Sequence, residues 1–208
     1  MPVSVPQILM NIEQCLLEKY NNRSLGVITV GESVARSGKE HLWDECPARS
    51  PDTIVIHYTS AVNVLPGDPY NFERIVQIFC EYQVSSHYLI TREGAVIQLV
   101  PEEHAAWHSG GSIMPAPDNR RRVNDFSVGI ELVGGEQDRF DDAQYESLQE
   151  LIDTVELGRG GACKLVGHED VAGERAVKIG LRTIPKYDPG PQFDWHRIRQ
   201  PRFGYHIC

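Results

Sequence analysis

Two of the eight histidines stand in contexts that favour a chemical role. His57 interrupts the apolar and β-branched run of residues 53–59, a pattern typical of a buried strand. His168 ends a second short run, residues 164–168, and two acidic residues follow it directly. A buried imidazole needs a polar partner, and a metal ion is a good one. The alternative is that each is an ordinary hydrogen-bonded histidine, which is the more common role of this residue.

Glu131 is the third unusual residue. It lies inside the apolar segment 126–133, where a carboxylate is costly unless it is paired or functional. The alternative is simple alternation, with Glu131 on a solvated face and polar residues at positions 129 and 133. The chain has Gly129 and Val133 there. On these residues alone, the functional and the structural interpretation of Glu131 are equally well supported.

Asp188 and Lys186 lie in the segment Lys-Tyr-Asp-Pro-Gly-Pro, residues 186–191. Asp-Pro-Gly is a common turn, so the alternative is a carboxylate that caps its own backbone. Two neutral imidazoles and one carboxylate are nevertheless the ligand set of catalytic zinc, and they leave a fourth tetrahedral position for water. Together with a buried glutamate and a lysine they would form a complete hydrolytic set.

The elements that must position these residues alternate between strands and helices, which indicates an α/β fold with a mixed sheet. Helical spacing predicts helices over residues 6–20, 70–83 and 141–157, and the start of a last helix within 193–198. Strands are predicted at 25–30, 53–59, 86–91, 95–100, 126–133 and 164–168. Gly94 is predicted to turn the hairpin between the third and fourth of these strands. The segments 36–51, 109–124 and 169–193 are predicted to be irregular.

Composition sets the class of protein and its partners. The chain has 208 residues, which fits one domain, and 20 basic against 29 acidic residues give a net charge of −9. That charge disfavours nucleic acid and anionic membranes as partners. The five cysteines form no CxxC pair, so we expect free thiols in a reducing compartment. The first 19 residues carry neither a basic start nor a long apolar run, so we expect a cytoplasmic protein without a membrane span. No feature indicates an obligate protein partner.

Six segments in order carry a resemblance to a known family. The chain resembles the zinc-dependent N-acetylmuramoyl-L-alanine amidases of the AmpD type, whose superfamily includes phage amidase-type lysozymes and peptidoglycan recognition proteins. The resemblance covers about residues 52–199. It implies an amidase-2 fold: a single domain with a central mixed sheet flanked by helices. It also implies a zinc amidase domain at 51–208, with residues 1–50 as an extension that packs on the core. The six segments are residues 53–59 (TIVIHYT), 84–90 (VSSHYLI), 106–110 (AWHSG), 124–131 (NDFSVGIE), 166–170 (VGHED) and 186–195 (KYDPGPQFDW).

The resemblance also implies the reaction and the residues that perform it. The reaction would hydrolyse the amide bond between N-acetylmuramic acid and L-alanine of peptidoglycan stem peptides, with soluble muropeptide fragments, in the 1,6-anhydro form, as substrates. Glu131 would be the base that activates water, and Lys186 would stabilise the oxyanion. The remaining implied residues are His57, His168 and Asp188 as ligands of one zinc ion, and Trp107, His108 and Asn124 as residues of the substrate groove.

Three features depart from the family pattern. Residues 169–187 are about twice as long as the corresponding loop usual in the family, so they could reshape the site. Pro185 stands where an arginine usually precedes the lysine, and Arg175 or Arg182 could replace that arginine in binding substrate. Residues 1–50 lie outside the resemblance, and packing on the core is the favoured role over substrate binding.

Two other functions stay open on the sequence. A lytic amidase that acts on intact peptidoglycan, such as a phage endolysin or a delivered toxin, would use the same residues. The net charge and the lack of wall-binding repeats favour soluble fragments instead. A non-catalytic peptidoglycan-binding module typically lacks the third metal ligand, whereas Asp188 is present here.

Overall fold

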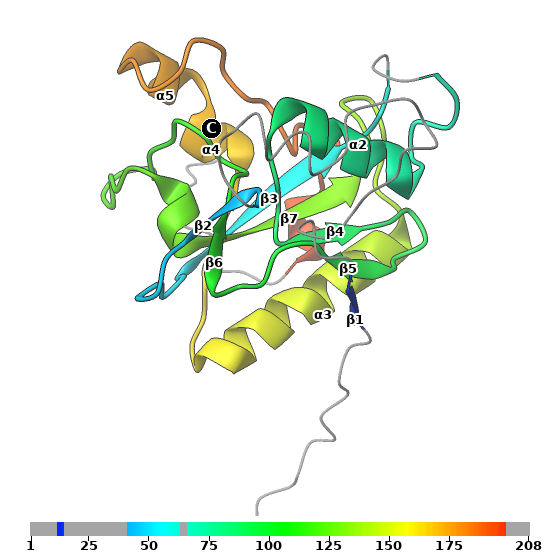
Figure 1. Cartoon of the computed structure of the whole chain (residues 1–208), viewed down its shortest axis with the longest axis horizontal. Helices are drawn as coiled ribbons and strands as arrows, with labels where there is room; N and C mark the ends of the chain where they lie inside the picture. Colours follow the sequence, from blue (N-terminus) through cyan, green and yellow to red (C-terminus); the bar gives the residue numbers. More distant parts are fainter. Residues whose placement is uncertain (1–11, 15–40, 63–65, 199–208) are drawn as a thin grey trace, which may run out of the picture.

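A mixed β-sheet forms the centre of the computed structural model, which describes residues 12–14, 41–62 and 66–198. Six strands follow the order β1-β5-β4-β7-β3-β8. Figure 1 shows the run from β1 through β5, β4 and β7 to β3. All neighbours pair in parallel except β4 and β5, whose antiparallel hairpin turns at Gly94 with φ +84°. The mixed sheet and the hairpin confirm the sequence-based prediction. The strands are β1 (Ile12–Gln14), β3 (Thr53–Thr59), β4 (Tyr88–Ile90), β5 (Val96–Gln98), β7 (Ser127–Val133) and β8 (Lys164–Gly167).

The two long helices, α2 (Phe72–Tyr82) and α3 (Asp142–Arg159), lie on opposite sides of the sheet (Figure 1). The Asn71 side chain accepts a hydrogen bond from Arg74 N at the start of α2, and Gln144 accepts one from Asp141 N at the start of α3. Such side chains satisfy backbone donors that the first turn of a helix leaves unpaired. Both helices confirm their predicted positions. The apolar stripe of α3 that packs on the sheet consists of Tyr145, Leu148, Leu151, Ile152 and Val155.

Side-chain alternation along β3 and β7 separates the main core from the face that carries the chemistry. Ile54 and Ile56 of β3 pack in the core beneath α3. Successive side chains of a strand point to opposite faces, so Val55 and His57 lie on the other side of the sheet. Glu131 of β7 is the parallel register partner of His57 and shares that face. The fold thus brings a buried histidine and a buried carboxylate together.

The segment after β8 contains more helix than the sequence indicated. Residues 169–193 were predicted to be irregular, but α4 (His168–Ala172) starts directly after β8, and α5 (Glu174–Lys178) follows. Gly173 separates the two helices, where a Cβ atom would lie 2.2 Å from Glu169 O. Helices of five residues show too little periodicity to be recognised in a sequence. The predicted last helix is a single 3-10 turn, η3 (Trp195–Arg197), and another 3-10 turn, η2 (Val123–Phe126), precedes β7.

Three short strands correct other predictions. The helix predicted over 6–20 is wrong where the chain is described, because Ile12–Gln14 form β1, an edge strand parallel to β5. The rest of that helix and the strand predicted at 25–30 lie outside the described residues. Two further strands, β2 (Trp43–Glu45) and β6 (His104–Ala106), pair antiparallel in a small second sheet and were not predicted. Three residues are too few for an alternation pattern to identify a strand. Among the described helices, none has the length and apolar character needed to cross a bilayer.

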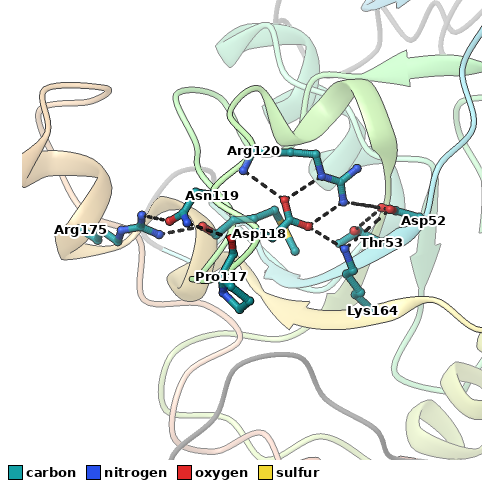
Figure 2. A network of polar contacts seen from close by, with 9 residues as sticks. Asp52, Thr53, Pro117, Asp118, Asn119, Arg120, Lys164 and Arg175 are labelled. Carbon is teal, nitrogen blue, oxygen red and sulfur yellow. Dashed lines mark hydrogen bonds and ion pairs between the residues drawn. The ribbon is translucent and has the colours of Figure 1, made fainter.

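A polar network connects segments at the amino ends of β3 and β8, the end of the sheet opposite to His57 and Glu131. Asp118 accepts from Arg120 Nε at 2.8 Å and from Lys164 Nζ at 2.6 Å, and its side chain is only 6 % exposed. Arg120 also reaches Asp52, the residue before β3, at 2.9 Å. Figure 2 shows the Asp118 carboxylate between Arg120 and Lys164. The hydrogen bond from Arg120, assisted by one from Lys164, lowers the pKa of Asp118. The network therefore ties the loop before η2 to the first residues of β3 and β8.

We predict that Asp118→Asn lowers the free energy of unfolding at pH 7 by about 1–3 kcal/mol, because it leaves two half-buried cations without their shared anion. The folded pKa of Asp118 lies below its ordinary value of 3.8. Its contribution is therefore complete above about pH 4 and is lost as the pH falls further. Urea unfolding at several pH values measures both effects. The difference in the free energy of unfolding between parent and variant should become smaller in acid.

The matched control is Asp142→Asn, which removes an ion pair with Arg197 whose carboxylate side chain is 84 % exposed. Exposed pairs contribute little, so this variant should unfold almost as the parent does. Equal unfolding curves for the Asp118 variant and the parent at pH 7 would show that the network contributes nothing.

Candidate metal centre

A cavity of about 780 Å³ opens at the carboxyl ends of β3 and β7 and beside the start of α4. Parallel strands commonly place ligand sites at this edge, because the chain leaves the sheet there and its loops converge. Most of the candidate functional residues identified in the sequence line this cavity. Its lining includes His57, His108, Trp107, Asn124, Glu131, His168, Arg182, Lys186 and Asp188.

Three buried side chains in this cavity form a group that can hold a metal ion. One ligand atom each from His57, His168 and Asp188 lies within 4.8 Å of the others. Asp188 Oδ2 is 3.1 Å from His57 Nδ1 and 3.0 Å from His168 Nδ1. Ligands bound tetrahedrally at 2.0–2.1 Å are roughly 3.3 Å apart, so these spacings fit one small ion bound through both Nδ1 atoms.

Electrostatics hold two of these groups in the form that binds metal. Burial and, to a smaller extent, the neighbouring His168 lower the pKa of His57 to about 4, so the His57 imidazole is neutral at pH 7. Burial by itself would raise the pKa of Asp188, but the two adjacent histidines outweigh it and the net shift is downward. A neutral imidazole and an ionised carboxylate are the forms in which these side chains bind metal.

Local structure fixes each of the three residues. His57 lies near the end of β3, and His168 is the first residue of α4, directly after β8. Asp188 accepts a backbone hydrogen bond from Glu169 N at 2.8 Å, which holds the third residue against α4. Gly167 permits this approach, because a Cβ atom there would lie 2.8 Å from Pro189 Cδ. A strand end, a helix start and a returning loop therefore meet at one point.

Glu131 is buried beside this group, and its Oε2 atom has no hydrogen-bond partner among the described residues. Burial raises the pKa of Glu131 well above its ordinary value; the charge of Asp188 raises it further, and Lys186 opposes the shift. Unpaired buried carboxylates are costly and are concentrated at functional sites. The arrangement gives Glu131 the properties of a proton carrier.

The residues predicted to bind substrate are distributed unevenly. Trp107, Asn124 and Arg182 line the cavity, whereas Arg175 is not part of its lining. The Arg175 guanidinium instead donates to Met114 O and Asn119 Oδ1. These contacts fasten α5 to the loop before η2 (Figure 2). Of the two arginines, only Arg182 therefore has access to a molecule in the cavity.

Sequence reasoning missed several residues of the cavity wall. Tyr58, Tyr82, Glu136 and Tyr187 line it beside the predicted residues. Tyr58 and Tyr187 each adjoin a residue of the histidine–carboxylate group in sequence, and that neighbourhood was an available signal. Tyr82 ends α2 and Glu136 follows β7, so only the folded chain shows that they belong to the site.

The fold and this site define an α/β class of protein in which a histidine–carboxylate group lies beside a buried glutamate at the carboxyl edge of a mixed sheet. The sequence model for N-acetylmuramoyl-L-alanine amidases matches residues 47–191. The chain belongs to the N-acetylmuramoyl-L-alanine amidase family. This confirms the resemblance inferred from the six segments.

Three relatives locate the chain within the family. It is 43% identical over 117 residues, 55% of each chain, to the 1,6-anhydro-N-acetylmuramyl-L-alanine amidase AmpD of Enterobacter cloacae. A selenomethionine AmpD structure aligns with 74% of this chain and 87% of its own, at 32% identity and TM-score 0.58. The AmiD amidase of E. coli in complex with an anhydro-N-acetylmuramic acid peptide aligns with 71% of this chain and 55% of its own, at 30% identity and TM-score 0.55. The chain spans about half the length of the curated relatives it matches.

The segment 173–184 contributes Arg182 to the cavity lining and packs very closely on the chain before η2. A Cβ atom on Gly111 would lie 2.0 Å from Leu181 O, so only glycine permits this contact. Arg182 Nη1 reaches Ser109 O at 3.5 Å from the same segment. The long loop noted in the sequence is thus held beside the candidate metal centre by contacts with residues 109–111.

We predict that Gly111→Ala displaces the segment 173–184 from the cavity rim, because backbone atoms on both sides of the contact must move apart. Limited digestion with trypsin should then cut faster after Lys178 and Arg182, while the far-ultraviolet circular dichroism stays that of the parent. Gly158→Ala is the control, since nothing lies within 4 Å of a Cβ atom at that position. Identical cleavage of the Gly111 variant and the parent would contradict the close packing.

Proposed function

We propose that this protein is a zinc-dependent amidase that hydrolyses the bond between N-acetylmuramic acid, in its 1,6-anhydro form, and L-alanine of soluble muropeptides. The observation that carries the proposal is the buried His57–His168–Asp188 group next to Glu131, whose Oε2 atom has no hydrogen-bond partner within the described part of the chain. Family membership supports it, as does the activity named for the Enterobacter relative. Muropeptide recycling in the cytoplasm is the corresponding role.

His57, His168 and Asp188 are the proposed zinc ligands. Two nitrogen donors and one carboxylate suit zinc, and a three-ligand set is characteristic of catalytic rather than structural sites. When bound, zinc polarises a carbonyl group and lowers the pKa of a water molecule toward ~7. The three side chains are buried, which keeps competing water away from the reacting bond.

Glu131 is the proposed general base and acid. Its carboxylate lies on the same face of the sheet as His57 but is not part of the group that can hold a metal, which supports a role as base rather than ligand. It takes a proton from the attacking water and then delivers that proton to the nitrogen of the leaving L-alanine. A buried carboxyl group with a raised pKa is suited to holding the proton between these two events.

Lys186 is the proposed stabiliser of negative charge on the carbonyl oxygen. It lines the cavity, and its charge lowers the pKa of Glu131, so its electrostatic influence reaches the reacting region. The backbone of Lys186 is fixed by a hydrogen bond of 3.1 Å from its N–H group to Ala172 O. This bond holds the base of the side chain at the cavity, and a positive charge positioned in advance stabilises a developing oxyanion.

The cavity wall supplies contacts for the rest of the muropeptide. Trp107 and Asn124 line one part, and we propose that they contact the substrate there. Arg182 can pair with a stem-peptide carboxylate through charge-assisted hydrogen bonds. A role for Arg175 in binding stays a prediction from the sequence, and its present contacts give it a structural task instead.

We predict close to one zinc ion per chain in the purified protein, and a loss of that zinc when any one of His57, His168 or Asp188 is changed to alanine. Removing one of three protein ligands leaves too few donors to hold the ion. Elemental analysis of dialysed protein measures the content. His196→Ala is the control, because this histidine is exposed and does not line the cavity. Three variants that retain the parent's zinc would exclude the assignment.

We predict that Glu131→Gln retains zinc but turns over ~10²–10⁴-fold more slowly, the scale of general acid–base catalysis. The assay supplies anhydro-muropeptides and intact sacculi separately, and mass spectrometry identifies the released peptides. The parent should release peptides beginning with L-alanine, and faster from the soluble fragments. Release mainly from sacculi would favour a lytic amidase, and no release from either substrate would favour a binding module.

A further inference from the structure

The second ring nitrogen of His57 has a partner that the proposed chemistry does not use. If His57 binds the ion through Nδ1, the neutral ring carries its proton on Nε2. That atom is 3.0 Å from Nδ1 of His108, a residue that is 8 % exposed. Because the His57 N–H group must donate, His108 Nδ1 accepts, and the proton of His108 is then on Nε2.

The hydrogen bonds continue away from the metal with one consistent direction. His108 Nε2 is 3.2 Å from Ser127 Oγ, which accepts, because the Ser127 hydroxyl itself donates to Val123 O at 2.6 Å. Ser109 Oγ also lies 3.0 Å from His108 Nδ1 and shares that acceptor. Both ring nitrogens of His108 are therefore engaged within the protein, which leaves neither for a molecule in the cavity.

Gly129 makes the position of the His108 ring possible. A Cβ atom at residue 129 would lie 2.5 Å from Cγ and 2.8 Å from Nδ1 of His108. No side chain larger than hydrogen fits there without moving the imidazole. This also accounts for a glycine in the middle of the buried strand β7, where glycine weakens a strand and needs a reason.

We propose that His108 is a positioning residue that orients the metal ligand His57, with Ser127 fixing its tautomer and Gly129 its place. The inference rests on the proposed function, since it takes His57 as a ligand through Nδ1. His108 lines the cavity, as the family resemblance implies, but its ring nitrogens contact His57 and Ser127 rather than a bound molecule. Partners of ligating histidines fix ring orientation and raise ligand basicity, and their loss typically costs about 10–100-fold in metal affinity.

The test compares two substitutions of His108 that differ in one property. His108→Leu removes the acceptor and should weaken Zn²⁺ binding by about 10–100-fold in competition with a chromophoric chelator. His108→Asn places its Oδ1 atom close to the position of Nδ1 and should recover most of the affinity. The visible spectrum of the Co²⁺-loaded protein should change in the leucine variant and stay close to that of the parent in the asparagine variant.

Two further variants distinguish a loss of His57 orientation from general damage to the packing of the core. His87→Leu removes a neighbouring buried histidine that bonds to Gly129 N and His104 O, and should leave zinc affinity close to that of the parent. Gly129→Ala pushes the His108 ring away and should reproduce the leucine phenotype, even if His108→Leu itself does not fold.

The outcomes distinguish this inference from the proposed function. Unchanged Zn²⁺ affinity and Co²⁺ spectra in folded His108→Leu and Gly129→Ala proteins would overturn the role of His108 while leaving the zinc site intact. Equal losses in His108→Leu, His108→Asn and His87→Leu would also overturn it, because they would indicate damage to packing. A parent protein that takes up no zinc would overturn both proposals.

Discussion

The main physical constraint on this structure is the free-energy cost of burying four ionisable side chains at a single edge of the sheet. His57, His168, Asp188 and Glu131 are all buried within or beside one group. Each is expensive to bury alone, and a carboxylate most of all. Mutual contacts offset part of the cost for the first three residues, whereas Glu131 keeps one oxygen without a hydrogen-bond partner among the residues that the structure describes. Such an arrangement persists in a folded protein when binding and catalysis require it.

Much of the surrounding fold serves to make this arrangement possible. The parallel register of β3 and β7 puts His57 and Glu131 side by side, and α4 begins at His168 itself. Close approaches then depend on the absence of a side chain. Gly167 admits Pro189 next to Asp188, and Gly129 admits the His108 ring behind His57. These glycines act by making room, because neither has a positive φ.

The sequence predicted the residues of the site better than their arrangement. His57 and Glu131 were recognisable because each interrupts an apolar strand, and the β-branched pattern identified those strands. No pattern showed that the two residues are register partners, because pairing depends on contacts remote in sequence. His108 lines the cavity as the motif implied, but its burial and its contact with His57 cannot be read from the motif alone. The five-residue helices and three-residue strands escaped prediction because they are too short to show a repeating pattern of apolar residues.

The environments of Glu131 and Lys186 differ in a way that matches their proposed roles. Glu131 is buried, and its raised pKa makes it a stronger base toward water and lets it hold the proton until the nitrogen leaves. Lys186 is exposed at the cavity mouth, where a bound substrate would displace the surrounding water. Its charge then acts on the carbonyl oxygen in a drier environment, in which electrostatic interactions are stronger. The proposed roles thus differ in depth at this edge of the sheet: proton transfer belongs to the buried residue, Glu131, and charge stabilisation to the exposed residue, Lys186.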